Sequence, residues 1–235
     1  MRAAARLRRV TRSTIVATAF AGCLQVVAQA QAASAWPDSF VARLEALALI
    51  QSLNAEILGG RSATLTLEHW CREHRLAAEP RVAARVIAGV DQPMSAEQRQ
   101  RLQVAGETVK YRRVQLSCGG HVLSEAENWY VPGRLTAEMN RLLETTDTPF
   151  GRAVQALEPY RRTIDAKLLW SPLPAGWEGK SGPRAPCATA GALQIPDALF
   201  EHRAVLYTRE HQPFSEVHEV YQREVLAFPA PSACD

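Results

Sequence analysis

The chain has 235 residues, a formal net charge of +3 and a hydrophobic fraction of 47%, which is ordinary for a globular protein. Its basic residues are scattered and form no helical stripe or aromatic ladder, which argues against a nucleic-acid-binding protein. Without an N-terminal targeting segment, about 200 residues remain, and these are enough for one well-buried core.

The first 35 residues have the layout of a secretory signal peptide. Arginines make the start of the chain positive, residues 13–27 are uncharged and mostly apolar, and small-x-small cleavage sites follow over residues 28–35. The apolar run is short for a membrane span. An uncleaved anchor and lipidation at Cys23 are the alternatives. We therefore expect an exported, periplasmic protein with a single domain over residues 36–235 and no stable membrane span after cleavage.

The exported part contains four cysteines, which are Cys71, Cys118, Cys187 and Cys234. Four cysteines allow three pairings. Because exported cysteines usually pair with each other, we favour two disulfides that join the first to the second and the third to the fourth. A metal site is the alternative, since Cys71 and Cys118 are each followed three residues later by a histidine. We expect disulfides, no bound metal and no cofactor.

The first predicted element is a helix over residues 37–58, with proline in its first turn and Gly59-Gly60 at its end. Its apolar residues recur at helical spacing, and the predicted buried stripe is Phe40, Val41, Leu44, Leu47, Ala48, Ile57 and Leu58. Residues 62–68 alternate threonine with leucine. This alternation predicts a strand or the start of a short amphipathic segment.

A β-hairpin is predicted over residues 109–132, around Gly119-Gly120. Its first strand places Arg113 on one face and Arg112 on the other, because strand side chains alternate. The second strand comprises residues 122–123 and 128–131 and stops at Pro132. On the evidence of the hairpin alone, Arg113 is most simply a solvated strand residue.

The remaining elements alternate strands with few helices. Before the hairpin we expect a strand over 81–90 and then a short exposed helix or loop over 93–103, which begins with a Ser95-x-x-Gln98 capping pattern. After the hairpin we expect a helix over 135–144, a turn over 145–152 and a new element from residue 153. The chain then continues with a strand over 161–170, a long surface loop over 171–196, and strands over 199–209 and 216–228. This pattern predicts an α+β fold with a single mostly antiparallel sheet and helices packed on one side.

Several charged residues lie among apolar strand or turn residues, and these are Arg113, Glu125, Arg152 and Glu219. A buried arginine can hold a carboxylate through two parallel hydrogen bonds. A carboxyl group in an apolar pocket can act as an acid or a hydrogen-bond donor. A pocket that contains both an arginine and a carboxyl group suits a small aromatic or cyclic carboxylic acid. The alternative is that they pair with each other as structural ion pairs.

Motifs in the same order resemble those of the chorismate lyase family, which converts chorismate to 4-hydroxybenzoate and pyruvate. The matching segments are Ser62-Ala63-Thr64 with Glu68, Arg113 to Cys118 with Tyr130-Val131-Pro132, Thr148-Pro149-Phe150-Gly151-Arg152, and Glu219-Val220-Tyr221. The resemblance implies a chorismate lyase-like fold over most of the chain after its first 35 residues.

The resemblance also implies roles for individual residues. Arg113 would bind the ring carboxylate, Glu219 would lie near the ring hydroxyl, and Ala63 and Phe150 would contribute backbone groups, with Arg152 in the same motif as Phe150. Two departures from the family pattern, Ala63 for methionine and Phe150 for leucine, imply a pocket of different shape. Arg112 is a second candidate for the binding arginine, on the opposite strand face.

Two functions are therefore expected as alternatives. The first is a lyase that eliminates pyruvate from chorismate or a related enol ether, in which Arg113 holds the carboxylate and Glu219 acts at the hydroxyl end. The second is a non-catalytic exported protein that binds an aromatic or other small carboxylic acid in the same pocket. Export favours the second, because chorismate is a cytoplasmic metabolite.

Overall fold

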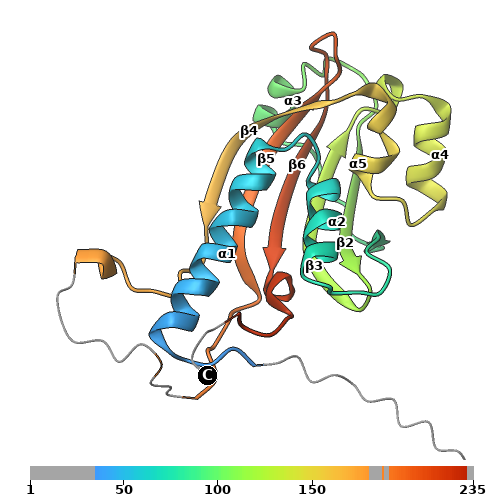
Figure 1. Ribbon diagram of the computed structural model, residues 1–235. Helices are drawn as coiled ribbons and strands as arrows, with labels where there is room; N and C mark the ends of the chain where they lie inside the picture. The colour runs from blue at the N-terminus through green and yellow to red at the C-terminus, as the bar shows by residue number, and fades with distance from the viewer. Residues whose placement is uncertain (1–34, 180–186, 188–190, 232–235) are drawn as a thin grey trace, which may run out of the picture. The chain divides into compact units, whose positions relative to one another are not determined.

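The computed structural model describes residues 35–179, 187 and 191–231, all within a unit that runs from Ala32 to Asp235 (Figure 1). The predicted signal peptide, residues 1–35, lies outside the described residues except for Ala35.

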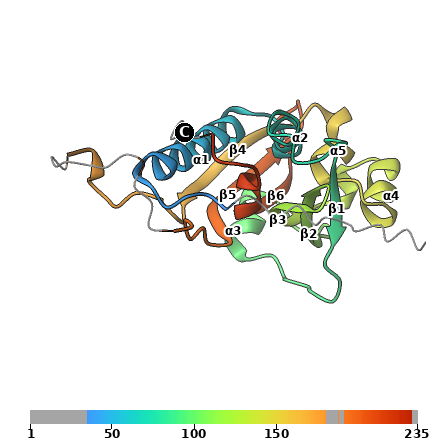
Figure 2. The same ribbon diagram turned by 60° about the horizontal axis from the view of Figure 1, so that its bottom comes forward.

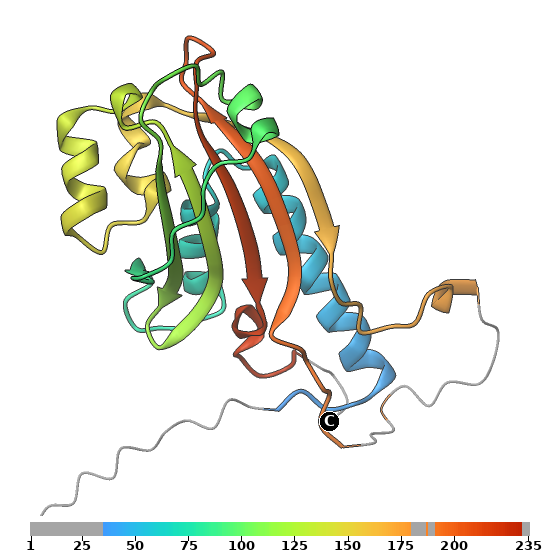
Figure 3. The ribbon, with the colours of Figure 1, turned by 180° about the vertical axis from the view of Figure 1, so that it is seen from behind.

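A six-stranded antiparallel sheet forms the centre of this unit. Its strands are β1 (Val82–Val86), β2 (Lys110–Cys118), β3 (His121–Tyr130), β4 (Tyr160–Leu168), β5 (Ala198–Tyr207) and β6 (Pro213–Gln222). They lie in the order β1-β2-β3-β6-β5-β4, and every neighbouring pair is antiparallel (Figure 3). The predicted α+β architecture with one antiparallel sheet is confirmed.

The longer helices cover one face of the sheet. The helices are α1 (Phe40–Gly59), α2 (Ala63–Glu73), α3 (Ala96–Arg101), α4 (Ala137–Thr145) and α5 (Phe150–Ala153), with 3-10 turns η1 (Pro132–Arg134), η2 (Gln155–Leu157), η3 (Trp177–Gly179) and η4 (Arg223–Leu226). Figure 2 shows α1 and α2 on one side of the sheet and the short α3 on the other. We call these sides the covered face and the open face.

Of the apolar stripe predicted for the helix α1, only Ile57 is fully buried. Ser39 caps it by accepting a hydrogen bond from the Ala42 backbone at 3.2 Å. The residues that face the sheet are Ala42, Ala46, Ile50, Leu53 and Ile57. By contrast, Leu44 and Leu58, both in the predicted stripe, are 37% and 41% exposed. The helix is apolar on several sides, so helical spacing alone could not select its buried face.

Residues 62–68, for which a strand was one expectation, belong to the helix α2. Ser62 is the N-cap, and its hydroxyl accepts from the Leu65 backbone. Leu67, Trp70 and Cys71 then lie three and four residues apart and are all buried. The amphipathic alternative is therefore confirmed.

The predicted hairpin forms β2 and β3. Gly119 in its turn has a φ of 59°, and a Cβ there would lie 2.9 Å from the Cβ of Ala77, so the position requires glycine. The second strand is continuous from His121 to Tyr130 and includes residues 124–127, which the predicted strand signal did not cover. Glu125 and Glu127 point to the open face between buried neighbours, so the strand tolerates them.

Three predicted boundaries were also wrong. Residues 145–152 were expected as a turn, but Phe150 opens the short helix α5 after Pro149. The strand expected over 216–228 ends at Gln222 and continues as η4. The strand expected over 81–90 is paired only from Val82 to Val86.

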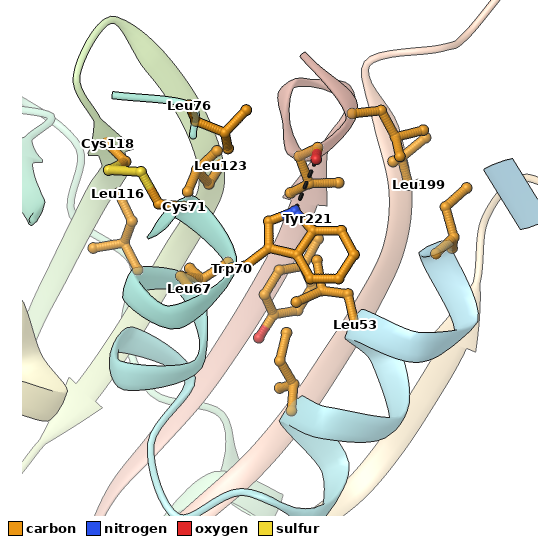
Figure 4. Close-up of a cluster of buried hydrophobic side chains, with 14 of the residues drawn as sticks. Leu53, Leu67, Trp70, Cys71, Leu76, Leu116, Cys118, Leu123, Leu199 and Tyr221 are labelled. Carbon is orange, nitrogen blue, oxygen red and sulfur yellow. Dashed lines mark hydrogen bonds between the residues drawn. A yellow bond between two sulfur atoms is a disulfide. The ribbon is translucent and has the colours of Figure 1, made fainter. Parts of the chain in front are cut away.

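A disulfide joins α2 to the end of β2. Cys71 and Cys118 are bonded, as predicted, within a cluster of buried apolar side chains (Figure 4). Trp70 fills the neighbouring space, and its indole N–H donates to the Val225 carbonyl at 2.8 Å. Because the two cysteines are bonded to each other, the alternative metal site is excluded. Cys234 lies outside the described residues, so its pairing with Cys187 stays a prediction.

Removing the disulfide should destabilise the protein. It closes a sequence separation of 47 residues, and the loss of loop-closure entropy predicts that Cys71→Ala/Cys118→Ala lowers the free energy of unfolding by about 2–4 kcal/mol. Urea unfolding of the oxidised protein and of the variant measures this change. An unchanged midpoint and slope would show that the bond adds no stability.

Within the described part of the chain, no helix has the length and apolar character that crossing a membrane requires. The same residues contain no group of three or more histidine, cysteine, aspartate or glutamate side chains suited to a metal ion.

Candidate functional site

Polar side chains form a buried group on the covered face. Arg112 on β2 lies opposite Asn128 on β3, while Glu219 on β6 lies between Ala126 on β3 and His202 on β5. Directly opposed residues of antiparallel strands point to the same side of a sheet. The four polar side chains therefore lie on one face, and all are buried.

A cavity of about 40 Å³ lies between this face and the first turns of α2 and α5. Apolar side chains of the sheet and Phe150 form much of its lining, and its buried polar residues include Thr64, Asn128, Arg161 and Glu219. Among the described residues, the Asn128 amide has no hydrogen-bond partner. One water molecule needs roughly 10–15 Å³ of such a volume, so the cavity fits a group of a few heavy atoms, such as a carboxylate.

Glu219 is held in a buried ion pair at this cavity. Its Oε2 lies 2.6 Å from Nη1 of Arg161, and the two side chains are 9% and 3% exposed. The Tyr221 hydroxyl donates to the same oxygen at 3.0 Å. Burial and the nearby Glu219 carboxylate raise the pKa of Tyr221 well above its usual value, so the phenol stays protonated. The Nε and Nη2 of Arg161 have no hydrogen-bond partner.

His202 extends the polar group toward α1. Its Nε2 lies 2.7 Å from Oδ1 of Asn54, and its Nδ1 is buried without a hydrogen-bond partner. Burial and the positive charge of Arg161 lower the pKa of His202 to about 4. The ring is therefore neutral at neutral pH and donates from Nε2 to the amide oxygen.

Acid should destabilise the fold through His202. The unfolded histidine titrates near its usual pKa of about 6.5, so between pH 6.5 and 4 the unfolded chain binds a proton that the folded chain does not. The stabilising contribution is complete above pH 6.5 and is lost as the pH falls toward 4, by about 2–3 kcal/mol between pH 7 and 4.5. Urea unfolding at both pH values should show this loss, and His202→Gln should remove it. An equal pH dependence in His202→Gln would contradict the assignment.

Arg112 has no counterion among the described residues. It is 6% exposed, and its Nη2 donates to the Thr148 carbonyl at 3.3 Å, while Nε and Nη1 are buried without partners. Burial lowers the pKa of Arg112, with the Tyr130 hydroxyl as a smaller opposing influence. Arginine nevertheless stays charged in proteins. Arg161 and Arg152 on the same face have carboxylate partners in Glu219 and Glu68, and Arg152 is also 41% exposed. Arg112 has neither a carboxylate partner among the described residues nor the exposure to solvent that would compensate for one.

The structure brings some of the predicted site residues together and separates others. Ala63, Phe150 and Glu219 line the cavity. Arg113 does not, because it lies on the open face with its Nη2 at 3.0 Å from Oε2 of Glu125. Arg152 also lies outside the cavity lining and pairs with Glu68. Arg113 and Glu125 therefore pair with each other, as the alternative expected, whereas Arg152 and Glu219 pair with residues outside the predicted group.

Two residues of the cavity were not predicted from the sequence. Arg161 is the second residue of β4, which follows a turn in which Glu158 has a left-handed backbone. Its partner Glu219 is far away in the sequence. Asn128 was expected only as part of a strand. For Arg112, alternation with Val114 and Leu116 was the signal that it faces the core.

No family model matches the chain. It is 49% identical over 198 residues to the uncharacterized protein y4mC of Sinorhizobium fredii, and the match covers 83% of both chains. Among solved structures, the effector domain of PhnF from Mycobacterium smegmatis is similar at a TM-score of 0.44 and 14% identity, over 71% of this chain and 91% of that one. The ligand-binding domain of a protein assigned to the GntR family of transcriptional regulators from Bordetella bronchiseptica is similar at a TM-score of 0.37 and 20% identity, over 60% and 82%.

Proposed function

The chain belongs to the protein family of y4mC from Sinorhizobium fredii, and we propose that it binds a small aromatic or cyclic carboxylic acid on the covered face of its sheet. The observation that carries the proposal is the buried, unpaired guanidinium of Arg112. Asn128, directly opposite it, lines the cavity with an unused amide. A carboxylate placed there would neutralise the buried charge and accept the free N–H groups.

The energetics support an anionic ligand. A buried charge without a partner is costly, and a buried pair with good hydrogen bonds offsets most of that cost. A guanidinium matches a carboxylate through two parallel hydrogen bonds. The cavity has room for the carboxylate group. Arg112 is not among the residues that line it, but it lies directly opposite Asn128, which is. Because Arg161 is already paired with Glu219, we propose Arg112 as the anchor.

Titration calorimetry with 4-hydroxybenzoate and its neutral analogue 4-hydroxybenzamide tests this function. The two ligands have nearly the same shape, so a difference reports the charge. We expect the acid to bind at least tenfold more tightly than the amide, because only the acid neutralises Arg112. Equal binding of both, or binding of neither, would contradict the proposal.

Elimination of pyruvate from chorismate is the second candidate function. The observation that favours it is the place of Glu219 in the cavity, at the position where the chorismate lyase resemblance implies contact with the ring hydroxyl. Two observations favour binding instead: Glu219 is already paired with Arg161, and the cavity is smaller than a ring. Incubation with chorismate, followed for 4-hydroxybenzoate and pyruvate, distinguishes the two, since only a lyase releases both products in equal amounts.

We also propose that the protein is exported. The layout of residues 1–35 supports this, and so does the Cys71–Cys118 disulfide, because such bonds persist in oxidising compartments. Cell fractionation and intact mass measurement should find a periplasmic protein whose N-terminus lies within residues 28–36. A cytoplasmic protein that retains Met1 would contradict export.

A further inference from the structure

A second hollow adjoins the cavity on its outer side. This outer chamber has a volume of about 400 Å³ and shares Arg61, Ser62, Gly151 and Pro159 with the lining of the inner cavity. The four shared residues mark the junction between the two spaces. The inner cavity and the outer chamber therefore border each other between α2 and α5.

The two volumes point to a ligand longer than its carboxylate head. Ligand pockets commonly measure about 300–1,000 Å³, and the inner cavity of about 40 Å³ is far below that range, whereas the outer chamber falls within it. We infer that the natural ligand is a carboxylic acid with an extended apolar tail, whose head lies in the inner cavity and whose tail lies in the outer chamber. This inference rests on the proposed carboxylate site and defines the ligand class further.

The lining of the outer chamber suits such a tail. Leu65 and Pro159 provide apolar surface, and Leu65 is 39% exposed although it lies beside a buried turn of α2. Arg61, Gln155 and Glu158 provide polar groups. Glu158 is already paired with Arg209 at 3.0 Å, so the chamber does not present an unpaired carboxylate that would repel an acid.

Gly151 packs closely against the start of α2 at the border of the two spaces. A Cβ at this position would lie 2.8 Å from Oγ of Ser62 and 3.0 Å from Oγ1 of Thr64. A side chain at residue 151 would therefore displace these two hydroxyls or α5 itself. Because Ser62 and Gly151 line both spaces, such a shift would change the border between them.

A series of alkoxybenzoates tests the inference. The ligands are 4-alkoxybenzoates and their 3-alkoxy isomers with one to six alkyl carbons. In at least one of the two isomer series, we expect the affinity to rise by about two- to fourfold per carbon, because each methylene buries apolar surface. Leu65→Asp, which changes only the outer chamber, should remove most of this gain and leave the one-carbon acid within about threefold of wild type. Leu44→Asp, at an equally exposed position on α1, is the matched control and should retain the full gain.

Gly151→Ala tests the junction independently. It should weaken every acid of the series at least tenfold, while circular dichroism and the melting temperature verify that the protein is folded. If Gly151→Ala is folded and binds the acids as tightly as wild type does, the ligand does not extend across the border at Gly151, and the inference is wrong.

The outcomes separate this inference from the proposed function. Binding of the one-carbon acid with no gain along either series would overturn the extended ligand and leave the carboxylate site intact. A gain that persists unchanged in Leu65→Asp would place the tail elsewhere and would also overturn the inference. If no acid of any length binds, the proposed function itself fails.

Discussion

Replacing Arg112 with methionine should make the ligand-free protein more stable, by about 1–3 kcal/mol in the free energy of unfolding. The reason is that a buried guanidinium without a carboxylate costs more desolvation energy than its single bond to the Thr148 carbonyl returns. Methionine fills similar space and adapts to irregular gaps. A gain in stability from removing a charged residue identifies a position that is kept for a purpose other than folding.

Arg113→Met is the matched control for that result. Arg113 is the next residue of the same strand, but its side chain is 37% exposed and paired with Glu125 on the open face. Loss of an exposed ion pair changes stability by about 1 kcal/mol or less. Urea unfolding of both variants at neutral pH measures the contrast. A loss of several kcal/mol in Arg112→Met would show that Arg112 is structural and would contradict the account.

Glu219→Gln should cost about 3–5 kcal/mol. The substitution keeps the shape of the side chain but leaves the guanidinium of Arg161, which is 3% exposed, without its charge partner. The double variant Arg161→Met/Glu219→Gln should recover most of the loss, because it removes the stranded charge. Unfolding measurements on the two single variants and the double variant give the interaction energy directly.

A second glutamate–arginine pair, on the open face, provides a comparison for this prediction. Glu216 is even more buried than Glu219, and Arg101 donates two hydrogen bonds to it, of 2.7 and 2.8 Å. Arg101, however, is 35% exposed and can be rehydrated once its partner is lost. Glu216→Gln should therefore cost less than Glu219→Gln. Equal costs would contradict the view that burial of the arginine decides the effect.

Local patterns predicted much of the fold, because they depend on neighbours in the sequence. The Gly119-Gly120 turn and the alternation around it predicted the hairpin, and the Ser95-x-x-Gln98 pattern predicted the capping box of α3. The buried face of α1 could not be predicted in this way. Its leucines occur on several sides, and contact with the sheet is what selects the side with Ala42 and Ala46.

Which side chains reach the site depends on the register of the strands, and the resemblance did not determine that register. A shift of one residue moves a strand side chain to the other face of the sheet. This shift is the difference between Arg113, paired with Glu125 on the open face, and Arg112, buried beside Asn128. The pairing of Arg161 with Glu219 arises only when β4, β5 and β6 assemble, so no local signal in the sequence marks it.

The central claim is that Arg112, and not Arg113, anchors a carboxylic acid on the covered face. Calorimetric titration of 4-hydroxybenzoate into wild type, Arg112→Met and Arg113→Met tests it most directly. We expect Arg112→Met to lose at least thirtyfold in affinity, because truncation of a buried charged partner costs about 2–5 kcal/mol, and Arg113→Met to stay within about threefold of wild type. Retained binding in Arg112→Met, or loss in Arg113→Met alone, would contradict the account.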